Sequence, residues 1–261
     1  MTVKDLIAAL ELPASCRVDQ RIPKKLLVEN GAPTAADKRN INEGIEEIQW
    51  LASIKPSSVG VPEYRDETHE YLEIAILEVT LRQDAKATRL AELIHRAIPY
   101  PVLLMLIDGK RVTLSMSHIR WAQNEAGKVV LEGELAAVSL DEQSATQDIF
   151  PAFLQALSIS RQPRANLRVL YQGWFDTLAA YQVSLITGVF VQSKTDEQAA
   201  ARRTNLLACR ELEQQIASFR AAAVKEKLIA RRVEMNIAIK NLEVQRLELR
   251  NQLSGNKGYE N

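Results

Sequence analysis

Two acidic residues in the first half of the chain, Asp66 and Glu78, are of the type that restriction-like, metal-dependent nucleases use. Those enzymes need an Asp and then, on a central strand, an acid and a lysine separated by one residue, to bind Mg²⁺ and position water. Glu78 lies in a predicted strand, but Thr80 stands where the lysine is needed. A metal-dependent nuclease with a degenerate or unconventional site therefore stays open as an alternative interpretation.

The other reactive residue types lack the spacing that catalysis or metal binding needs. His69, His95 and His118 fall in different elements without a second His or Cys at helical spacing, so no zinc site is predicted. We interpret His95, near the end of a predicted helix, as a partner of the helix dipole. No phosphate-binding glycine loop, dinucleotide fingerprint or G-x-S-x-G elbow occurs, and Cys16 and Cys209 are typical of unrelated thiols in a reducing compartment. We therefore predict no catalytic residue, no metal and no cofactor, and the sequence favours a protein that is not an enzyme.

A cluster of basic residues lies near the C-terminal end of the chain. It stands out because 33 Lys and Arg balance 33 Asp and Glu in the whole sequence, so that no overall charge attracts nucleic acid. Such a run is typical of a solvated helix face, but it is also a candidate contact for nucleic-acid phosphates or an acidic partner. The cluster has one acid, Glu226, among these five cations: Arg220, Lys225, Lys227, Arg231 and Arg232.

The helix predicted for residues 231–253 is apolar on two sides. One stripe keeps the 4-3 spacing of a coiled-coil seam, and the second lies about 200° away because it is two residues out of step. Asn236 lies between the stripes, where its amide can hydrogen-bond to a partner and fix the register. The first stripe and Asn236 give the candidate interaction residues Met235, Asn236, Ile239, Leu242, Leu249 and Leu253, and the second stripe consists of Val233, Ile237, Val244 and Leu247.

This helix is predicted to be the end of a single long helix that runs from about Glu197 to Leu253. Its first seam shifts register near Val224 and Leu228, which is the pattern of a stutter. The helix either folds back on the 164–186 helix within one molecule or packs one face on its own chain and the other on a second copy. Because both stripes need cover, we expect a homo-oligomer.

The first half of the chain predicts a mixed sheet covered by helices. Alternation and β-branched residues indicate strands over 70–82, 100–107, 110–116 and 128–140, with a helix over 84–98 and an Asp-Gly hairpin turn at 108–109. The first 55 residues are predicted to be mostly helical, since Thr34 and Asp37 resemble a capping box and Ile41, Ile45, Ile48 and Ala52 follow at helical spacing.

These elements predict an α+β protein of several regions. They are an α+β domain over 1–143, a helical connector over 144–192, the long coiled-coil-like helix over 193–255 and a disordered tail over 256–261. No stretch is long and apolar enough to span a bilayer, and the N-terminus lacks the features of a signal peptide, so we expect a cytoplasmic protein without a membrane partner.

Several stretches together resemble a bacterial family that is described only as a domain of unknown function. They are "RIPKK", "DKRNINEGIEEIQWLASIKP", "ELIHRAIPYPVLLML" and "KEKLIARRVEMNIAIKNL", with "IPYP" and "RRVEMNIAIK" the most specific. The resemblance extends from about residue 12 to 250. It implies genes that lie beside helicase and DNA methyltransferase genes in restriction-like phage-defence loci, and it implies no catalytic residues.

The residues and the resemblance together predict a non-catalytic interaction subunit of a bacterial antiviral, restriction-like defence complex. Its expected partner is a helicase, nuclease or methyltransferase. The alternatives are a nucleic-acid-binding accessory protein that contacts DNA or RNA through the basic cluster, and the nuclease considered above.

Overall fold

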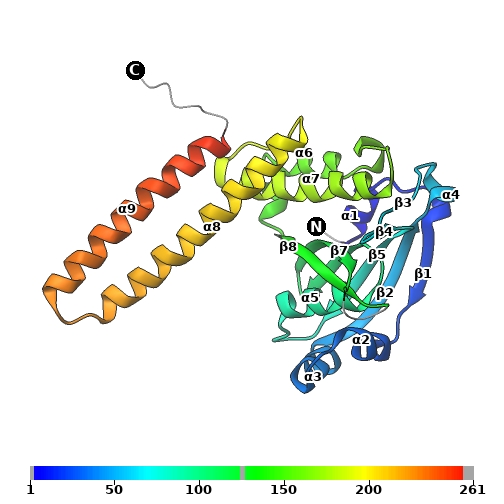
Figure 1. Ribbon diagram of the computed structural model, residues 1–261, viewed down its shortest axis with the longest axis horizontal. Coiled ribbons are helices and arrows are strands. Elements are labelled where there is room, and N and C mark those ends of the chain that lie inside the picture. Colours follow the sequence, from blue (N-terminus) through cyan, green and yellow to red (C-terminus); the bar gives the residue numbers. More distant parts are fainter. Residues whose placement is uncertain (1–2, 124–126, 255–261) are drawn as a thin grey trace. The chain divides into compact units, whose positions relative to one another are not determined.

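The structure, a computed structural model, describes residues 3–123 and 127–254. The chain forms two compact units, residues 1–178 and 179–261, and the boundary between them lies within the long helix α7 (Leu167–Thr187) (Figure 1). We call the first the sheet unit and describe each unit by itself. The predicted tail over 256–261 lies outside the described residues.

A six-stranded sheet with the order β1-β2-β5-β6-β7-β8 forms the centre of the sheet unit. Strands β5 and β6 pair in parallel, joined by the crossover helix α5, and the other neighbours in this order pair antiparallel, so the sheet is mixed as predicted. The unit also contains a separate two-stranded sheet, β3-β4. The strands are β1 (Arg17–Arg21), β2 (Ile45–Ile54), β3 (Tyr64–Arg65), β4 (Glu70–Tyr71), β5 (Ile74–Leu81), β6 (Val102–Asp108), β7 (Arg111–Trp121) and β8 (Val129–Leu140).

Helices cover both faces of this sheet. Leu27 of α2, Ile41 of α3 and Leu90 of α5 share one buried cluster with alternate residues of β5 and β6. Because successive side chains of a strand point to opposite faces, buried Leu103 and Met105 face the other side, which is covered by α1, α6 and the first part of α7 (Figure 1). The helices are α1 (Val3–Ala9), α2 (Lys24–Gly31), α3 (Ala35–Gly44), α4 (Pro56–Val59), α5 (Ala87–Ala97) and α6 (Phe150–Ala156), with short 3₁₀ turns η1 (Ala14–Cys16), η2 (Ser144–Thr146) and η3 (Ile159–Arg161).

Tyr171 ties α7 to the sheet from inside the core. Its hydroxyl donates to the carbonyl oxygen of Val102, 2.8 Å away, and accepts from the backbone N–H of Ser117 at 3.1 Å. The side chain is fully buried. Residues up to 178, which the sequence analysis places in a connector, therefore belong to the packing of the sheet unit.

The helix predicted through Ile48 and Ala52 is wrong, because α3 ends at Gly44 and β2 follows at once. The register of β2 against β5 shifts twice, between Ile45 and Glu47 and between Trp50 and Ala52. Each shift adds one residue to β2 and breaks its two-residue alternation. The first shift leaves Ile45 and Ile48, three residues apart, on the same face, whereas Ala52 pairs with Ile76 on the opposite face. Because both faces are covered, all three are buried and fall at the spacing of a helix although they lie on a strand. The predicted cap is confirmed, since the Thr34 hydroxyl accepts from the backbone N–H of Asp37.

The dipole role predicted for His95 is also wrong. The side chain is buried and its Nε2 lies 3.0 Å from the Ser115 hydroxyl, while burial lowers its pKa to about 3. A neutral imidazole offers no positive charge to the end of α5, so His95 acts as a polar core residue.

The second unit is an antiparallel helical hairpin, and the predicted single helix over 197–253 is wrong. Helix α8 spans Asp196–Lys225 and α9 spans Ile229–Leu253. The backbone leaves the helical conformation at Glu226 and Leu228, which cap the two ends of the break. The register shift in the sequence therefore marks a turn and not a stutter within one helix.

Candidate interaction surface

The first apolar stripe of α9 packs within the chain. Ile239 and Leu253 are only 8% and 2% exposed, and Leu249 and Leu253 join a cluster with Leu206 and Cys209 of α8. The other members of the stripe, Met235 and Leu242, are half-buried. Five of the six residues predicted to hold an interaction thus form the inner face of the hairpin.

Polar pairs connect the two helices across this face. Arg220 of α8 forms an ion pair with Glu243 of α9, and the Asn205 amide donates to Gln252 Oε1 at 3.3 Å. These pairs fix which residues of α8 and α9 stand opposite each other. One of the five predicted basic residues, Arg220, is therefore engaged within the hairpin.

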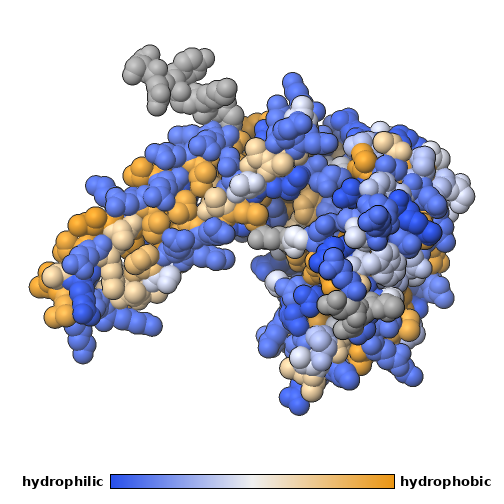
Figure 2. All heavy atoms as spheres, viewed as in Figure 1, coloured by the Kyte–Doolittle hydropathy of each residue, from blue (hydrophilic) through white to orange (hydrophobic). Residues whose placement is uncertain are grey.

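The second apolar stripe faces away from α8. Val233, Ile237, Val244 and Leu247 are 50–57% exposed, and Figure 2 shows apolar side chains gathered along α9. Lys240 and Asn251 continue the same line at the 4-3 spacing and are exposed as well. We call these six positions the outer stripe: Val233, Ile237, Lys240, Val244, Leu247 and Asn251.

The turn between the helices gathers the other four predicted cations. Lys225, Lys227, Arg231 and Arg232 are all exposed there, and the Glu226 carboxylate accepts from the backbone N–H of Leu228 at 2.8 Å. We call this region the basic tip. A break at residues 226–228 puts the four cations at one end of the hairpin, whereas a continuous helix would distribute them around its axis.

The basic tip also exposes apolar side chains that the sequence analysis did not assign to a site. Val224, Leu228 and Ile229 are 86%, 58% and 70% exposed. No glycine or proline occurs between residues 190 and 254 to reveal a turn, so the register shift near Val224 and Leu228 was the local sign of it in the sequence.

Asn236, the sixth predicted interaction residue, is exposed on the outer side of α9. It lies next to the outer stripe and not on the inner face. Its predicted role in fixing the register of a partner therefore stays a prediction, one that only an external partner can fulfil.

A groove of about 320 Å³, lined by both apolar and polar side chains, runs between α8 and α9. Glu211 and Glu248 line it from the two helices, together with Gln215, Gln245 and Gln252. Because Glu248 directly follows Leu247, the groove borders the outer stripe. This side of the hairpin therefore combines an apolar line with carboxylates and amides.

The structure places the residues of the nuclease alternative in two different sheets. Asp66 lies between β3 and β4, where its carboxylate accepts hydrogen bonds from the backbone N–H of Thr68 and the Tyr64 hydroxyl, each at 2.8 Å. These bonds lower the pKa of Asp66 well below its usual range. Glu78 lies in β5 of the other sheet, where burial raises its pKa. Among the described residues, no three His, Cys, Asp or Glu side chains are placed to hold a metal ion together.

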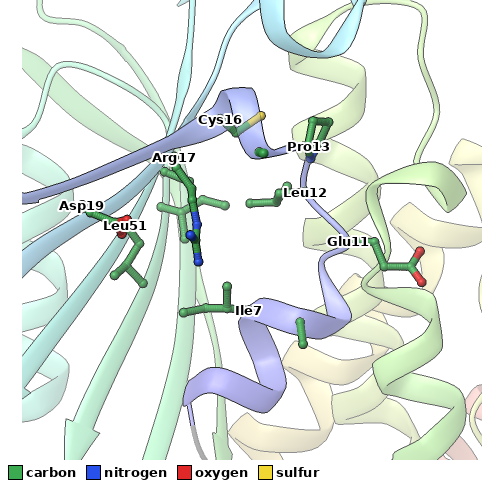
Figure 3. A pocket seen from close by; sticks show the side chains of 12 residues that line it. Ile7, Glu11, Leu12, Pro13, Cys16, Arg17, Asp19 and Leu51 are labelled. Carbon is green, nitrogen blue, oxygen red and sulfur yellow. The ribbon is translucent and has the colours of Figure 1, made fainter.

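A hollow of about 280 Å³ lies in the sheet unit between α1, η1 and the edge of β1 and β2 (Figure 3). Its walls are mostly apolar, including Ile7, Leu12 and Leu51. Figure 3 shows the Arg17 side chain pointing into it, while Glu11 points away and bonds to the Ser158 hydroxyl. Pockets that hold a specific ligand usually offer several convergent polar groups. We therefore consider the hairpin, and not this hollow, as the candidate interaction surface.

Comparisons with known proteins bear on the family of the chain. No curated protein and no solved structure matches it. Of the helices that the structure describes, none combines the length and apolarity needed to cross a bilayer. A family described as a domain of unknown function, DUF4391, matches residues 10–245, which is most of the sequence. The chain belongs to the DUF4391 family.

Proposed function

We propose that the protein is a non-catalytic interaction subunit of a bacterial antiviral, restriction-like defence complex in the cytoplasm. Its hairpin docks to a helicase, nuclease or methyltransferase. The observation that carries the docking role is the outer stripe, four half-exposed aliphatic side chains in line on a helix whose other face is already packed. The class of partner and the defence context rest on the family resemblance, which implies neighbouring helicase and methyltransferase genes.

The arrangement of the hairpin supports docking over a purely structural role. Isolated exposed aliphatic residues are ordinary on protein surfaces, but four aliphatic side chains on one line of a helix, interrupted by Lys240, favour an interaction site. The stripe repeats at 4-3 spacing along most of α9, so it fits a helix or a helical surface of a partner. A hairpin that needed only internal stability would require one apolar face on each helix.

Co-purification from the native host tests this proposal. The tagged intact protein should retain a DNA-processing partner, identified by mass spectrometry, and the double variant Ile237→Asp/Leu247→Asp should lose it. Both changes lie on exposed positions, so circular dichroism should show unchanged helix content. A matched control, Glu142→Asp/Glu213→Asp, should retain the partner. Retention of the partner by the stripe variant would contradict the proposal.

Nucleic-acid binding at the basic tip is the second candidate function. The observation that favours it is the gathering of four exposed cations at the turn, with Arg220 alone of the predicted set engaged elsewhere. Contacts of this kind reach phosphates, so affinity should fall with salt at a log–log slope of roughly −0.9 per phosphate contacted on duplex DNA.

A triple variant tests the second candidate. Lys227→Ala/Arg231→Ala/Arg232→Ala should flatten the salt slope by about two to three units. The control Lys4→Ala/Lys38→Ala/Lys110→Ala removes the same charge from exposed positions of the sheet unit and should leave the slope unchanged. If the wild-type chain binds neither DNA nor RNA at low salt, the basic tip has no role with nucleic acid.

A further inference from the structure

One border of the outer stripe is acidic, and the other is mixed in charge. A helix turns about 100° per residue, so the residues beside each stripe position form its borders. One border follows positions 233, 240 and 247 and consists of Glu234, Asn241 and Glu248. The other border precedes positions 237, 244 and 251 and consists of Asn236, Glu243 and Arg250. The first border therefore carries two acids and no base, while the second carries Arg250 and Glu243, whose carboxylate is already paired with Arg220 of α8.

This charge pattern disfavours a second copy of α9 as the occupant. In an antiparallel pair with full overlap, equivalent borders meet and Glu234 stands opposite Glu248 of the second copy. In a parallel pair, Lys240 packs against Lys240 of the second copy. Like charges held in such positions destabilise a helix pair and select against that partner. The expected homo-oligomer therefore finds no support in this stripe.

The surroundings of the stripe extend the acidic character. Glu211 of α8 lines the groove beside Glu248, so two carboxylates from different helices face the same side. The groove also offers three glutamine side chains, which accept hydrogen bonds from ammonium and guanidinium groups. Long basic side chains that pass over the stripe would end in this groove.

We propose that the outer stripe receives an amphipathic helix of a different protein, with an apolar 4-3 line and with Lys or Arg on the border that meets Glu234 and Glu248. This inference rests on the proposed docking function and names the chemistry of the partner. From position 233 to position 251 the stripe spans about 27 Å at 1.5 Å per residue, which calls for a partner helix of about five turns. Opposite Lys240, the partner helix carries an acidic residue.

Peptide binding to the intact protein tests the proposal. Two fluorescent synthetic helices of about five turns share one apolar 4-3 line and differ only in Lys or Glu at the border positions. The Lys-bordered peptide should bind at least about tenfold more tightly at low salt, because complementary charges select the partner, and the difference should shrink as salt is added.

Variants of the protein separate charge selection from apolar docking. Glu234→Lys/Glu248→Lys should reverse the preference between the two peptides, and Ile237→Asp/Leu247→Asp should weaken binding of both. The control Glu142→Lys/Glu213→Lys changes the same charge at exposed positions outside the borders and should keep the preference for the Lys-bordered peptide. Circular dichroism of each variant shows whether the helices persist.

The outcomes distinguish this inference from the proposed function. Equal binding of the two peptides overturns the charge assignment but leaves the docking role, which the co-purification experiment tests separately. If neither peptide binds and sedimentation shows a dimer that Ile237→Asp dissociates, a second copy occupies the stripe and the inference is wrong. If neither peptide binds and the protein is a monomer, the inference is also wrong.

Discussion

The sheet unit buries its apolar side chains on both faces of the sheet, whereas the hairpin leaves one apolar stripe of α9 exposed. In β5 and β6, alternate residues face opposite sides and both sides are covered, so Leu77 and Leu104 are fully buried. In α9, Ile239 is covered whereas Ile237, two residues away, is 57% exposed. Both regions carry large aliphatic side chains, but only the first region buries nearly all of them in folding. Apolar surface that the fold leaves uncovered is available for binding.

Truncating one aliphatic side chain in each region should give the largest contrast. Leu77→Ala should lower the free energy of unfolding of the sheet unit by about 2–5 kcal/mol, because it opens a cavity in a closed core. Ile237→Ala should change stability by less than about 0.5 kcal/mol, as for other exposed positions. All three tryptophans, Trp50, Trp121 and Trp174, belong to the sheet unit, so urea unfolding followed by their fluorescence reports on it, and circular dichroism reports on the hairpin. A cost for Ile237→Ala comparable to that for Leu77→Ala would contradict the difference between the regions.

Lowering the pH should destabilise the sheet unit through protonation of the buried His95. Burial lowers its pKa from 6.5 to about 3, so the unfolded chain binds a proton that the folded chain does not. The contribution of His95 to the free energy of unfolding is therefore complete above about pH 6.5. It decreases by up to about 1.4 kcal/mol per pH unit as the pH falls from there towards 3. His95→Gln keeps a neutral polar group near Ser115 and should flatten this part of the stability profile, measured by urea unfolding at several pH values. An unchanged profile would show that the buried imidazole does not control it.

Polar pairs should show the smallest contrast between the regions. Tyr171→Phe removes a hydroxyl that is buried between α7 and two strands, and it should cost about 1–3 kcal/mol because backbone partners lose their hydrogen bonds. Arg220→Ala removes a partly exposed ion pair of the hairpin and should cost less than about 1 kcal/mol. Thermal unfolding followed by fluorescence for the first and by circular dichroism for the second provides the comparison. Equal losses of stability would mean that the Arg220–Glu243 pair is as shielded from water as the Tyr171 hydroxyl.

Local sequence patterns predicted the central part of the sheet unit well. The strand, helix and strand over 70–107 follow from β-branched runs and an amphipathic helical spacing, and they appear as β5, α5 and β6. The hairpin predicted at Asp108-Gly109 also forms, but one residue later: Asp108 ends β6 and pairs with Arg111, so Gly109 and Lys110 make the turn. Gly109 has φ +58°, which glycine adopts without strain. In these segments the periodicity and the turn residues favour the same structure, so the pattern alone was sufficient.

Sequence periodicity led to wrong predictions where pairing with a distant element altered the local structure. The helix-like spacing in β2 arises from the extra residue between Ile45 and Glu47 and from burial on both faces, which depend on its alignment with β5. The turn at 226–228 contains neither glycine nor proline, and it forms where α8 and α9 pack their seams against each other. Neither alignment is encoded in a short window of sequence, because each depends on a partner element more than about ten residues away.

For the candidate site, the sequence by itself determined that α9 has two opposed apolar stripes and that cations concentrate near residues 220–232. Only the tertiary structure decided which stripe is free, because α8 covers Ile239 and Leu253 and leaves Ile237 and Leu247 exposed. It also decided that four of the cations share one turn while Arg220 pairs with Glu243. The physical reason is that periodicity fixes the direction of a side chain relative to its own helix, whereas burial depends on what packs against that helix.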